Sequence, residues 1–181
     1  DKLRICPERS RGTKFRILKG AEVNIKKDGS LDISDTALAK LDIVGAAVHS
    51  HFGLSRAEQT KRIIRAISNQ HVDILFHPTG RLLGRRKAYE VDLDAVIAAA
   101  KKTGTVLEID ADPARLDLGG EYARKAVAAG VKLAIDSDSH NPHHFQNLEY
   151  GIGQARRGWA EKNDIINTRP LKEMLKLLKR K

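Results

Sequence analysis

The sequence predicts an α/β fold built around a parallel sheet. Short runs rich in β-branched residues alternate along the chain with longer segments of helical period, which is typical of repeated βα units. Polar side chains able to bind metals recur near the ends of the short runs, at the rim where barrel enzymes place their sites. The 181 residues contain no internal repeat and no linker rich in Pro, Gly or Ser. We therefore expect one domain that spans residues 1–181.

Six short apolar runs are expected as strands, and four segments of helical period are expected as helices. The first helix has Ser55 as its N-cap and Glu58 three residues later, which is the pattern of a capping box. The second begins at Asp92 and the third is closed by Gly130. The expected strands are residues 14–18, 21–25, 43–48, 72–76, 105–109 and 132–135, and the expected helices are residues 55–68, 92–102, 119–129 and 170–181.

The chain is strongly basic. Lys and Arg number 33 against 23 for Asp and Glu, which gives a formal net charge of +10 and a field that attracts polyanions such as DNA or RNA. A basic enzyme without a nucleic-acid partner would have the same composition. Cys6 is the one cysteine, so neither an intrachain disulfide nor a thiolate-rich zinc site is expected. That single cysteine and the lack of any apolar run near the roughly 18 residues of a membrane span favour a cytoplasmic protein without membrane contact.

Metal-competent side chains lie within or just after five of the expected strands. Residues two apart in a strand face the same way, so His49 with His51, and Asp138 with His140, can each point into one pocket. Imidazole nitrogens and carboxylate oxygens are ligands for Zn²⁺, Mn²⁺ and Fe²⁺. A single such residue has an ordinary structural explanation, whereas several at one rim favour a metal site. The candidates are Glu22, His49, His51, His77, Glu108, Asp110, Asp136, Asp138 and His140.

Alternatives stay open for several of these residues. Glu22 fits an exposed strand glutamate as well as a ligand, and Asp136 fits either a hydrogen bond to a ligand histidine or a cap of the turn at Ser137. His71 precedes a strand and is expected on the surface. Two further histidines, His143 and His144, follow a proline at an expected helix start, which favours phosphate contact or plain exposure over metal binding.

A dense basic loop follows His77. It carries Arg81, Arg85, Arg86 and Lys87, and its glycines at positions 80 and 84 allow the backbone to approach a phosphate closely. The alternative is a solvated run of charge. Carboxylates and imidazoles around two or more divalent ions activate water and hold both oxygens of an in-line phosphoryl displacement, so the residues favour phosphoester hydrolysis.

Other chemistries lack their motifs. The sequence contains no phosphate loop of the Gly-Lys-Ser/Thr kind, no Gly-x-Ser-x-Gly elbow and no Gly-x-Gly-x-x-Gly fingerprint. Aromatic residues make up only 4% of the chain, so backbone electrostatics is expected to dominate any binding of nucleic acid.

Four segments resemble the PHP (polymerase and histidinol phosphatase) domain, in the form found at the carboxyl end of X-family DNA polymerases. They are LKGAEV at residues 18–23, VHSHF at 48–52, HPTGRLLGRR at 77–86 and DSH at 138–140. The resemblance implies a distorted TIM-like barrel of seven βα units with up to three metal ions, usually Mn²⁺ or Zn²⁺. It also implies trimming of DNA 3′ ends, and an upstream polymerase region as a partner.

By position, the resemblance implies that Glu22, His49, His77, Asp138 and His140 bind the metals, and we expect Glu22, Asp138 and His140 to be catalytic. His51 is not a ligand in this pattern. It joins Arg81, Arg85 and Arg86 as an expected contact for the substrate phosphate.

The chain departs from the family pattern at its start. The family opens with a His-x-His pair, then an Asp and another His, and none of these is present, so the first βα units of the barrel are expected to be missing. A non-catalytic PHP module that stabilises a polymerase or grips DNA is therefore an alternative to a 3′–5′ exonuclease. A small-molecule phosphatase of the histidinol-phosphate kind ranks third, since a small anion does not need so wide a basic field.

Overall fold

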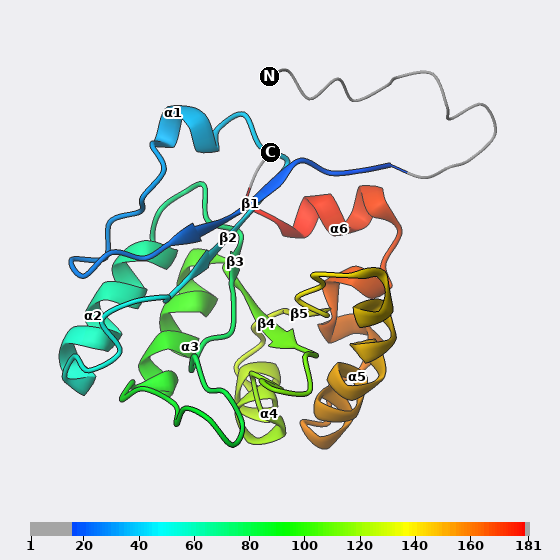
Figure 1. Ribbon diagram of the computed structural model, residues 1–181. Coiled ribbons are helices and arrows are strands. Elements are labelled where there is room, and N and C mark those ends of the chain that lie inside the picture. Colours follow the sequence, from blue (N-terminus) through cyan, green and yellow to red (C-terminus); the bar gives the residue numbers. More distant parts are fainter. Residues whose placement is uncertain (1–15, 180–181) are drawn as a thin grey trace.

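A five-stranded parallel sheet, with its strands in the order β1-β2-β3-β4-β5, forms the centre of the protein (Figure 1). The structure is a computed structural model, and it describes residues 16–179. Every strand neighbours the next one in the chain, as in a barrel wall, and the five strands are consistent with part of a barrel. The strands are β1 Gly20–Asn24, β2 Ile43–Ala47, β3 Ile74–Leu75, β4 Val106–Asp110 and β5 Leu133–Asp136.

Five of the six expected strands are confirmed, with small differences at their ends. The strand expected at residues 14–18 is wrong for residues 16–18, which are not part of any strand. Residues 14 and 15 lie outside the described part. β3 is shorter than expected. Its pairing nevertheless continues on both sides, since Asp73 N donates to Val44 O and Phe76 N donates to Ala46 O, both at 2.9 Å.

All four expected helices are present. Ser55 and Glu58 form the predicted capping box at the start of α2 (Arg56–Ile67). Asp92 caps α3 (Leu93–Thr103) by accepting a bond from Ala95 N, and Gly104 ends that helix with a φ of 72°. The other two are α4 (Gly120–Ala128) and α6 (Leu171–Leu177).

The expectation omitted two α-helices and three 3₁₀ turns. Of these, α5 (Leu148–Arg157) is the longest, and its glycines obscure the helical pattern in the sequence. Gly151 is needed for close packing, since a Cβ there would lie 2.6 Å from Ile135 Cγ2 and 2.8 Å from Ala111 Cβ. The remaining elements are α1 (Asp35–Leu38), η1 (Pro142–Asn147), η2 (Lys162–Asp164) and η3 (Ile166–Thr168).

The two faces of the sheet carry different side chains, as the alternation along a strand requires. Helices α2 to α5 lie in chain order along one face, over a core that includes Val23, Leu107 and Ile135 (Figure 1). On the other face a smaller cluster, with Ile74 and Val106, packs against α6 and η3. Glu22, Glu108 and Asp136 alternate with residues of the main core, so they lie on this second face at the carboxyl ends of the strands.

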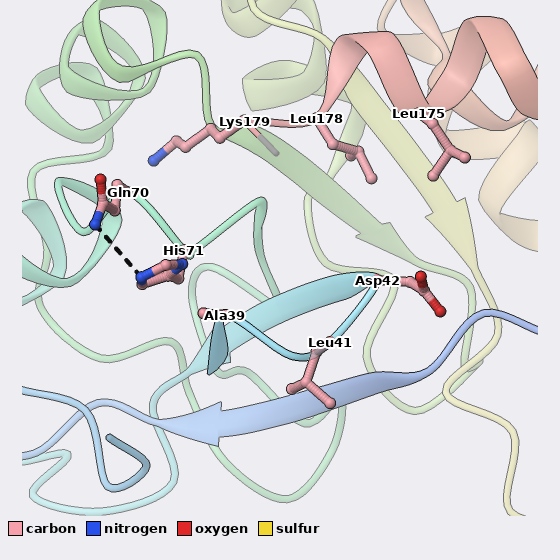
Figure 2. Close-up of a pocket in the computed structure, with 8 residues that line it drawn as sticks. All are labelled: Ala39, Leu41, Asp42, Gln70, His71, Leu175, Leu178 and Lys179. Atoms are coloured by element: carbon pink, nitrogen blue, oxygen red, sulfur yellow. Dashed lines mark hydrogen bonds between the residues drawn. The ribbon is translucent and has the colours of Figure 1, made fainter. Parts of the chain in front are cut away.

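The opposite, amino ends of the strands border a cavity of about 510 Å³ (Figure 2). Lys179 closes one side of it, with Nζ donating to Ile67 O at 2.5 Å and Asn69 O at 3.2 Å. Burial lowers the pKa of Lys179 to about 8. Across the described residues, no helix has the length and apolar character that would let it cross a membrane.

Candidate metal centre

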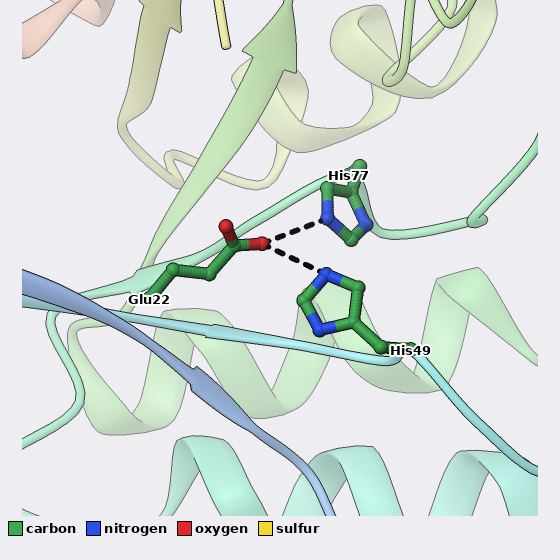
Figure 3. Close-up of side chains that lie close together, drawn as sticks. All are labelled: Glu22, His49 and His77. Carbon is green, nitrogen blue, oxygen red and sulfur yellow. Dashed lines mark hydrogen bonds and ion pairs between the residues drawn. The ribbon is translucent and has the colours of Figure 1, made fainter. Parts of the chain in front are cut away.

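Glu22, His49 and His77 come together at the carboxyl ends of the first three strands (Figure 3). A single carboxylate oxygen, Glu22 Oε1, lies 3.0 Å from His49 Nε2 and 3.0 Å from His77 Nε2. One ligand atom from each residue lies within 4.8 Å of the other two, which is close enough for one ion to reach all three. We refer to these residues as the three-residue centre.

Strand geometry places each of the three side chains. Glu22 lies within β1 and is paired in register with Gly45 of β2. His49 follows β2 by two residues and His77 follows β3 by two residues, so both imidazoles extend beyond the same edge of the sheet. His77 is 3% exposed and has a positive φ of 28°, and its backbone N–H donates to the Glu108 carboxylate.

Hydrogen bonds behind His49 fix which of its two ring nitrogens faces Glu22. Asn24 donates through Nδ2 to Asp32 Oδ2 at 2.5 Å, so Asn24 Oδ1 is an acceptor, and it lies 2.7 Å from His49 Nδ1. Nδ1 of His49 therefore donates to Asn24 Oδ1, and Nε2 is the ring nitrogen that faces Glu22 Oε1, at 3.0 Å. A carboxylate and an imidazole arranged in this way suit a divalent cation.

Glu22 is anionic in this arrangement. Hydrogen bonds from His49 and then from His77 hold the pKa of Glu22 well below its usual range, against the opposing effect of partial burial. An anionic oxygen beside two imidazole nitrogens is the donor set that Zn²⁺, Mn²⁺ or Fe²⁺ accepts. The three residues present therefore fit such an ion.

A cavity of about 280 Å³ extends from the three-residue centre to the ends of β4 and β5. Glu22 and His77 line one side of it and Asp138 another, so the structure brings the expected residues of three different strands to one space. Asp138 adopts a φ of 43°, in the left-handed region. The lining residues are Glu22, Phe76, His77, Glu108, Asp136, Ser137, Asp138, Ser139 and Phe145.

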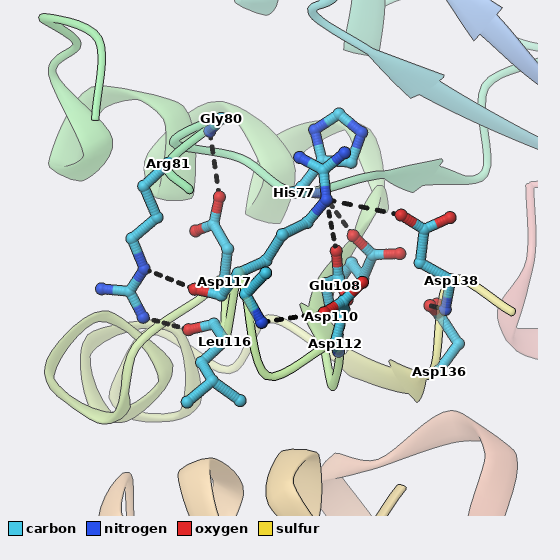
Figure 4. Close-up of polar contacts among 12 residues, drawn as sticks. His77, Gly80, Arg81, Glu108, Asp110, Asp112, Leu116, Asp117, Asp136 and Asp138 are labelled. Carbon is cyan, nitrogen blue, oxygen red and sulfur yellow. Dashed lines mark hydrogen bonds and ion pairs between the residues drawn. The ribbon is translucent and has the colours of Figure 1, made fainter. Parts of the chain in front are cut away.

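Buried carboxylates make this cavity strongly acidic (Figure 4). Burial raises the pKa of Glu108 well above its usual range, and the neighbouring Asp136 raises it further. Burial also raises the pKa of Asp136, and it raises that of Asp110 to about 8. Carboxylates crowded in this way gain from a cation placed among them.

Arg115 supplies one such positive charge from within the chain. Its Nε lies 3.1 Å from Asp110 Oδ2 and 3.4 Å from Asp138 Oδ2, and its side chain is only 17% exposed. No sequence motif had predicted a role for this residue. Its signal would have been the position of Arg115 in the short loop Ala111 to Leu116, directly after the acidic end of β4.

Comparison with known proteins identifies the family. The chain is 35% identical over 191 aligned positions to a probable phosphatase of Thermoanaerobacter sp. (strain X514), and the match spans 99% of this chain and 75% of that protein. It is 48% identical over 166 positions to the DNA polymerase/3′-5′ exonuclease PolX of Bacillus subtilis (strain 168). That match covers 92% of this chain and only 29% of the polymerase.

The chain belongs to the PHP family. A probable phosphatase of Shewanella oneidensis is another relative, 35% identical over 178 positions that span 93% of this chain and 68% of that protein. No family model matches the sequence.

His140 of the PHP chain lies beside Asp138 but outside the three-residue centre. Its Nδ1 is 2.7 Å from Asp138 O and 3.7 Å from Asp138 Oδ1, and 76% of its side chain is exposed. His144 holds it from the other side, since His140 N donates to His144 Nδ1 at 3.3 Å. His143 is exposed and His144 half-buried in η1, and the structure gives neither of them a place in the three-residue centre.

The basic loop of the PHP chain divides into inward and outward residues. Arg81 turns inward, with Nε donating to Arg115 O at 2.8 Å and Nη2 donating to Leu116 O (Figure 4). Arg86 donates to Gly80 O at 2.9 Å and lies over the Phe52 ring at 4.1 Å. Arg85 is exposed, as is His51 in the loop after β2, with a φ of 55°.

Asp117, a buried residue for which no sequence motif had predicted a role, fixes the turn before this loop. Asp117 accepts hydrogen bonds from Thr79 N at 2.8 Å and Gly80 N at 3.0 Å (Figure 4). Burial raises the pKa of Asp117, and the hydrogen bonds from Thr79 oppose the rise. The position of the basic loop relative to His77 therefore depends on the segment after β4.

Proposed function

We propose that this PHP chain is a metal-dependent phosphoesterase that acts on DNA and removes nucleotides from 3′ ends, as a 3′–5′ exonuclease in DNA repair. The observation that carries the proposal is the approach of two imidazole nitrogens to one anionic oxygen of Glu22, both at 3.0 Å, beside a cavity lined with carboxylates. That arrangement combines the ligands and the open space that metal-assisted phosphoryl transfer needs.

Glu22, His49 and His77 would hold one divalent ion, and Asp138 with His140 would hold another. Mn²⁺ or Zn²⁺ is the expected metal, with Fe²⁺ as a further option, and the complete family site would hold up to three ions in a barrel of seven βα units. Bound ions would lower the pKa of a water and stabilise charge on the phosphoryl oxygens. Residues 1–181 would form one domain.

The residues around the ions would orient the substrate and move its protons. Glu22 and Asp138 would be the catalytic carboxylates, since they would hold the ions in place around the reacting phosphate. His140, exposed beside Asp138, would act with it by holding the second ion near the leaving oxygen. Arg115, in contact with Asp110, would keep the Asp138 carboxylate oriented.

DNA is the proposed substrate because of charge and position. The chain carries a net charge of +10, and Arg85 is exposed in the loop that follows His77. Arg85 and His51 would contact backbone phosphates directly, whereas Arg81 and Arg86 would add charge while their hydrogen bonds hold the loop in shape. The name of the PolX relative, a polymerase with a 3′-5′ exonuclease, supports DNA as substrate and an upstream polymerase region as partner.

A small-molecule phosphatase is the second candidate. The relatives named probable phosphatases favour it, and the match to one of them covers 75% of that relative's length. The two candidates differ in the phosphoester they cleave, since a phosphatase hydrolyses monoesters and a 3′–5′ exonuclease hydrolyses the phosphodiester that joins the 3′-terminal nucleotide to the strand.

The test is cleavage of a 5′-labelled DNA duplex with Mn²⁺, compared with hydrolysis of p-nitrophenyl phosphate. The wild-type chain, Asp138→Ala and the control Asp94→Ala are compared; Asp94 is an exposed aspartate that pairs with Lys125 away from the cavity. We expect stepwise 3′ shortening by wild type and the control and none by Asp138→Ala. Hydrolysis of the monoester alone would favour the phosphatase, and DNA binding without hydrolysis would favour a non-catalytic module.

A further inference from the structure

Phe145 occupies an unusual position for an aromatic residue in this chain. It lines the same cavity as Glu22, His77 and Asp138, yet it is 64% exposed. The other phenylalanines within the described residues are engaged: Phe52 lies 6.2 Å from the Tyr89 ring and beneath Arg86, and Phe76 packs in the smaller core cluster. Phe145 thus presents an open aromatic surface to the acidic cavity.

The segment that carries Phe145 is held by a network of polar contacts. Asn141 caps η1 through a bond from His143 N at 2.9 Å, and its Nδ2 lies 2.7 Å from His144 Nε2. His144 in turn accepts from His140 N. Six residues beyond Phe145, Gly151 of α5 lies close to Ile135 of β5. The backbone that carries Phe145 is therefore held by the fold on both sides.

We propose that Phe145 is a stacking platform for the nucleobase of the 3′-terminal nucleotide whose phosphodiester is cleaved. The inference rests on the proposed function. A nucleobase is separated from its phosphate by one sugar, so a flat apolar surface on the wall of a phosphoester-cleaving cavity is where the base of the same nucleotide would lie. Every base has a π-face, so the contact would position the 3′ end without selecting a sequence.

The chemistry of the cavity favours a nucleotide over a purely apolar ligand. Apart from the two phenylalanines, the lining side chains are carboxylates, an imidazole and two serine hydroxyls, which suit divalent cations, and a phosphate would bind through those cations. The chain's net charge of +10 adds a long-range attraction for a polyanion. A ligand with both a phosphate and an aromatic ring would use both the polar, ion-binding part of the cavity and the exposed ring of Phe145.

The test is binding of two 5′-fluorescein oligonucleotides, measured by fluorescence anisotropy with Mn²⁺. One ends in thymidine and the other in a tetrahydrofuran abasic residue, and both carry a phosphorothioate at the last linkage to slow cleavage. Wild type is compared with Phe145→Ala, Phe145→Trp and the control Trp159→Ala. Trp159 is also an exposed aromatic, at 67%, but it packs against Arg124 and does not line the cavity.

We expect wild type to bind the thymidine end more tightly than the abasic end, by about 5- to 150-fold for one stacked base. Phe145→Ala should lose that preference and bind both ends as wild type binds the abasic end. Phe145→Trp and Trp159→Ala should keep it.

Equal binding of both ends by wild type, or an unchanged preference in Phe145→Ala, would overturn the platform while leaving DNA hydrolysis intact. An equal loss in Trp159→Ala would also overturn it, because the effect would then be general to exposed aromatics. Failure to bind either oligonucleotide would overturn the platform and the proposed function together.

Discussion

Asn24 provides a sensitive test of the metal centre, because it contacts His49 from behind and does not belong to the three-residue centre. Replacing it with alanine removes the acceptor that lies 2.7 Å from His49 Nδ1, while Glu22, His49 and His77 all remain. The His49 ring would then be free to rotate or to place its proton on Nε2, the atom that faces Glu22. Either change competes with binding of a cation.

The expected size follows from the geometry of the contact. Loss of a partner behind a metal-bound histidine costs about 10- to 100-fold in metal affinity, or about 1.4 to 2.7 kcal/mol. His49 is 40% exposed, so water can replace part of the lost hydrogen bond, and we expect a value near the lower limit. The dissociation constant for Zn²⁺ should therefore rise about tenfold in Asn24→Ala.

Isothermal titration calorimetry with Zn²⁺ at pH 7 measures this effect directly. Asn69→Ala is the matched control, since Asn69 also donates through Nδ2 to an aspartate, Asp35 Oδ1 at 2.8 Å, but precedes β3 and so lies at the opposite, amino ends of the strands. Thermal unfolding of both variants reports any loss of fold. Unchanged affinity in a folded Asn24→Ala protein would refute the argument that Asn24 orients His49.

Three further changes give distinct expectations. Gly45→Ala would place a Cβ 1.9 Å from the Phe76 ring, so we expect the free energy of unfolding, measured with urea, to fall by about 1–3 kcal/mol. Phe76→Leu in the same chain should partly restore it, because the smaller side chain relieves the clash. If the losses from the two substitutions simply added, the proposed contact would be contradicted. Asp110 has a pKa raised from 3.8 to about 8, so its protonated form stabilises the fold below pH 4 and that stabilisation is lost as the pH rises to 8. Relative to Asp110→Asn, metal-free wild type should therefore lose stability between pH 4 and 8, and parallel profiles would contradict the raised pKa. Arg85→Ala should weaken DNA binding for all sequences and lower the salt slope by about one, as measured by anisotropy across salt concentrations; an unchanged slope would remove Arg85 from the phosphate contacts.

Local sequence signals were sufficient for most of the fold. Capping residues such as Ser55, Asp92 and Gly104 mark helix ends through contacts within a few residues, and the structure has helices at those places. The failures involve contacts between distant residues. The run at residues 14–18 is apolar enough for a strand, but Arg16 to Leu18 find no neighbouring strand within the described part. The helix α5 depends on Gly151 fitting against Ile135, which no local pattern reveals.

The candidate site divides in the same way. Parallel strands bring their carboxyl ends to one edge, so a prediction of strand ends was enough to place Glu22, His49 and His77 near one another. The partners that orient and neutralise the site come from loops. Asp32 reaches Asn24 across a turn, and Arg115 reaches Asp138 from the loop after β4, through conformations that periodicity does not encode.

Binding of Mn²⁺, followed by electron paramagnetic resonance of the free ion, tests the central claim that Glu22, His49 and His77 form a divalent-metal centre. Wild type is titrated beside His49→Ala, His77→Ala and the control His143→Ala, whose imidazole lies outside the three-residue centre. We predict that wild type and the control deplete the free Mn²⁺ signal equally and that each of the other two variants loses one class of sites. Equal depletion by all four folded proteins would contradict the account.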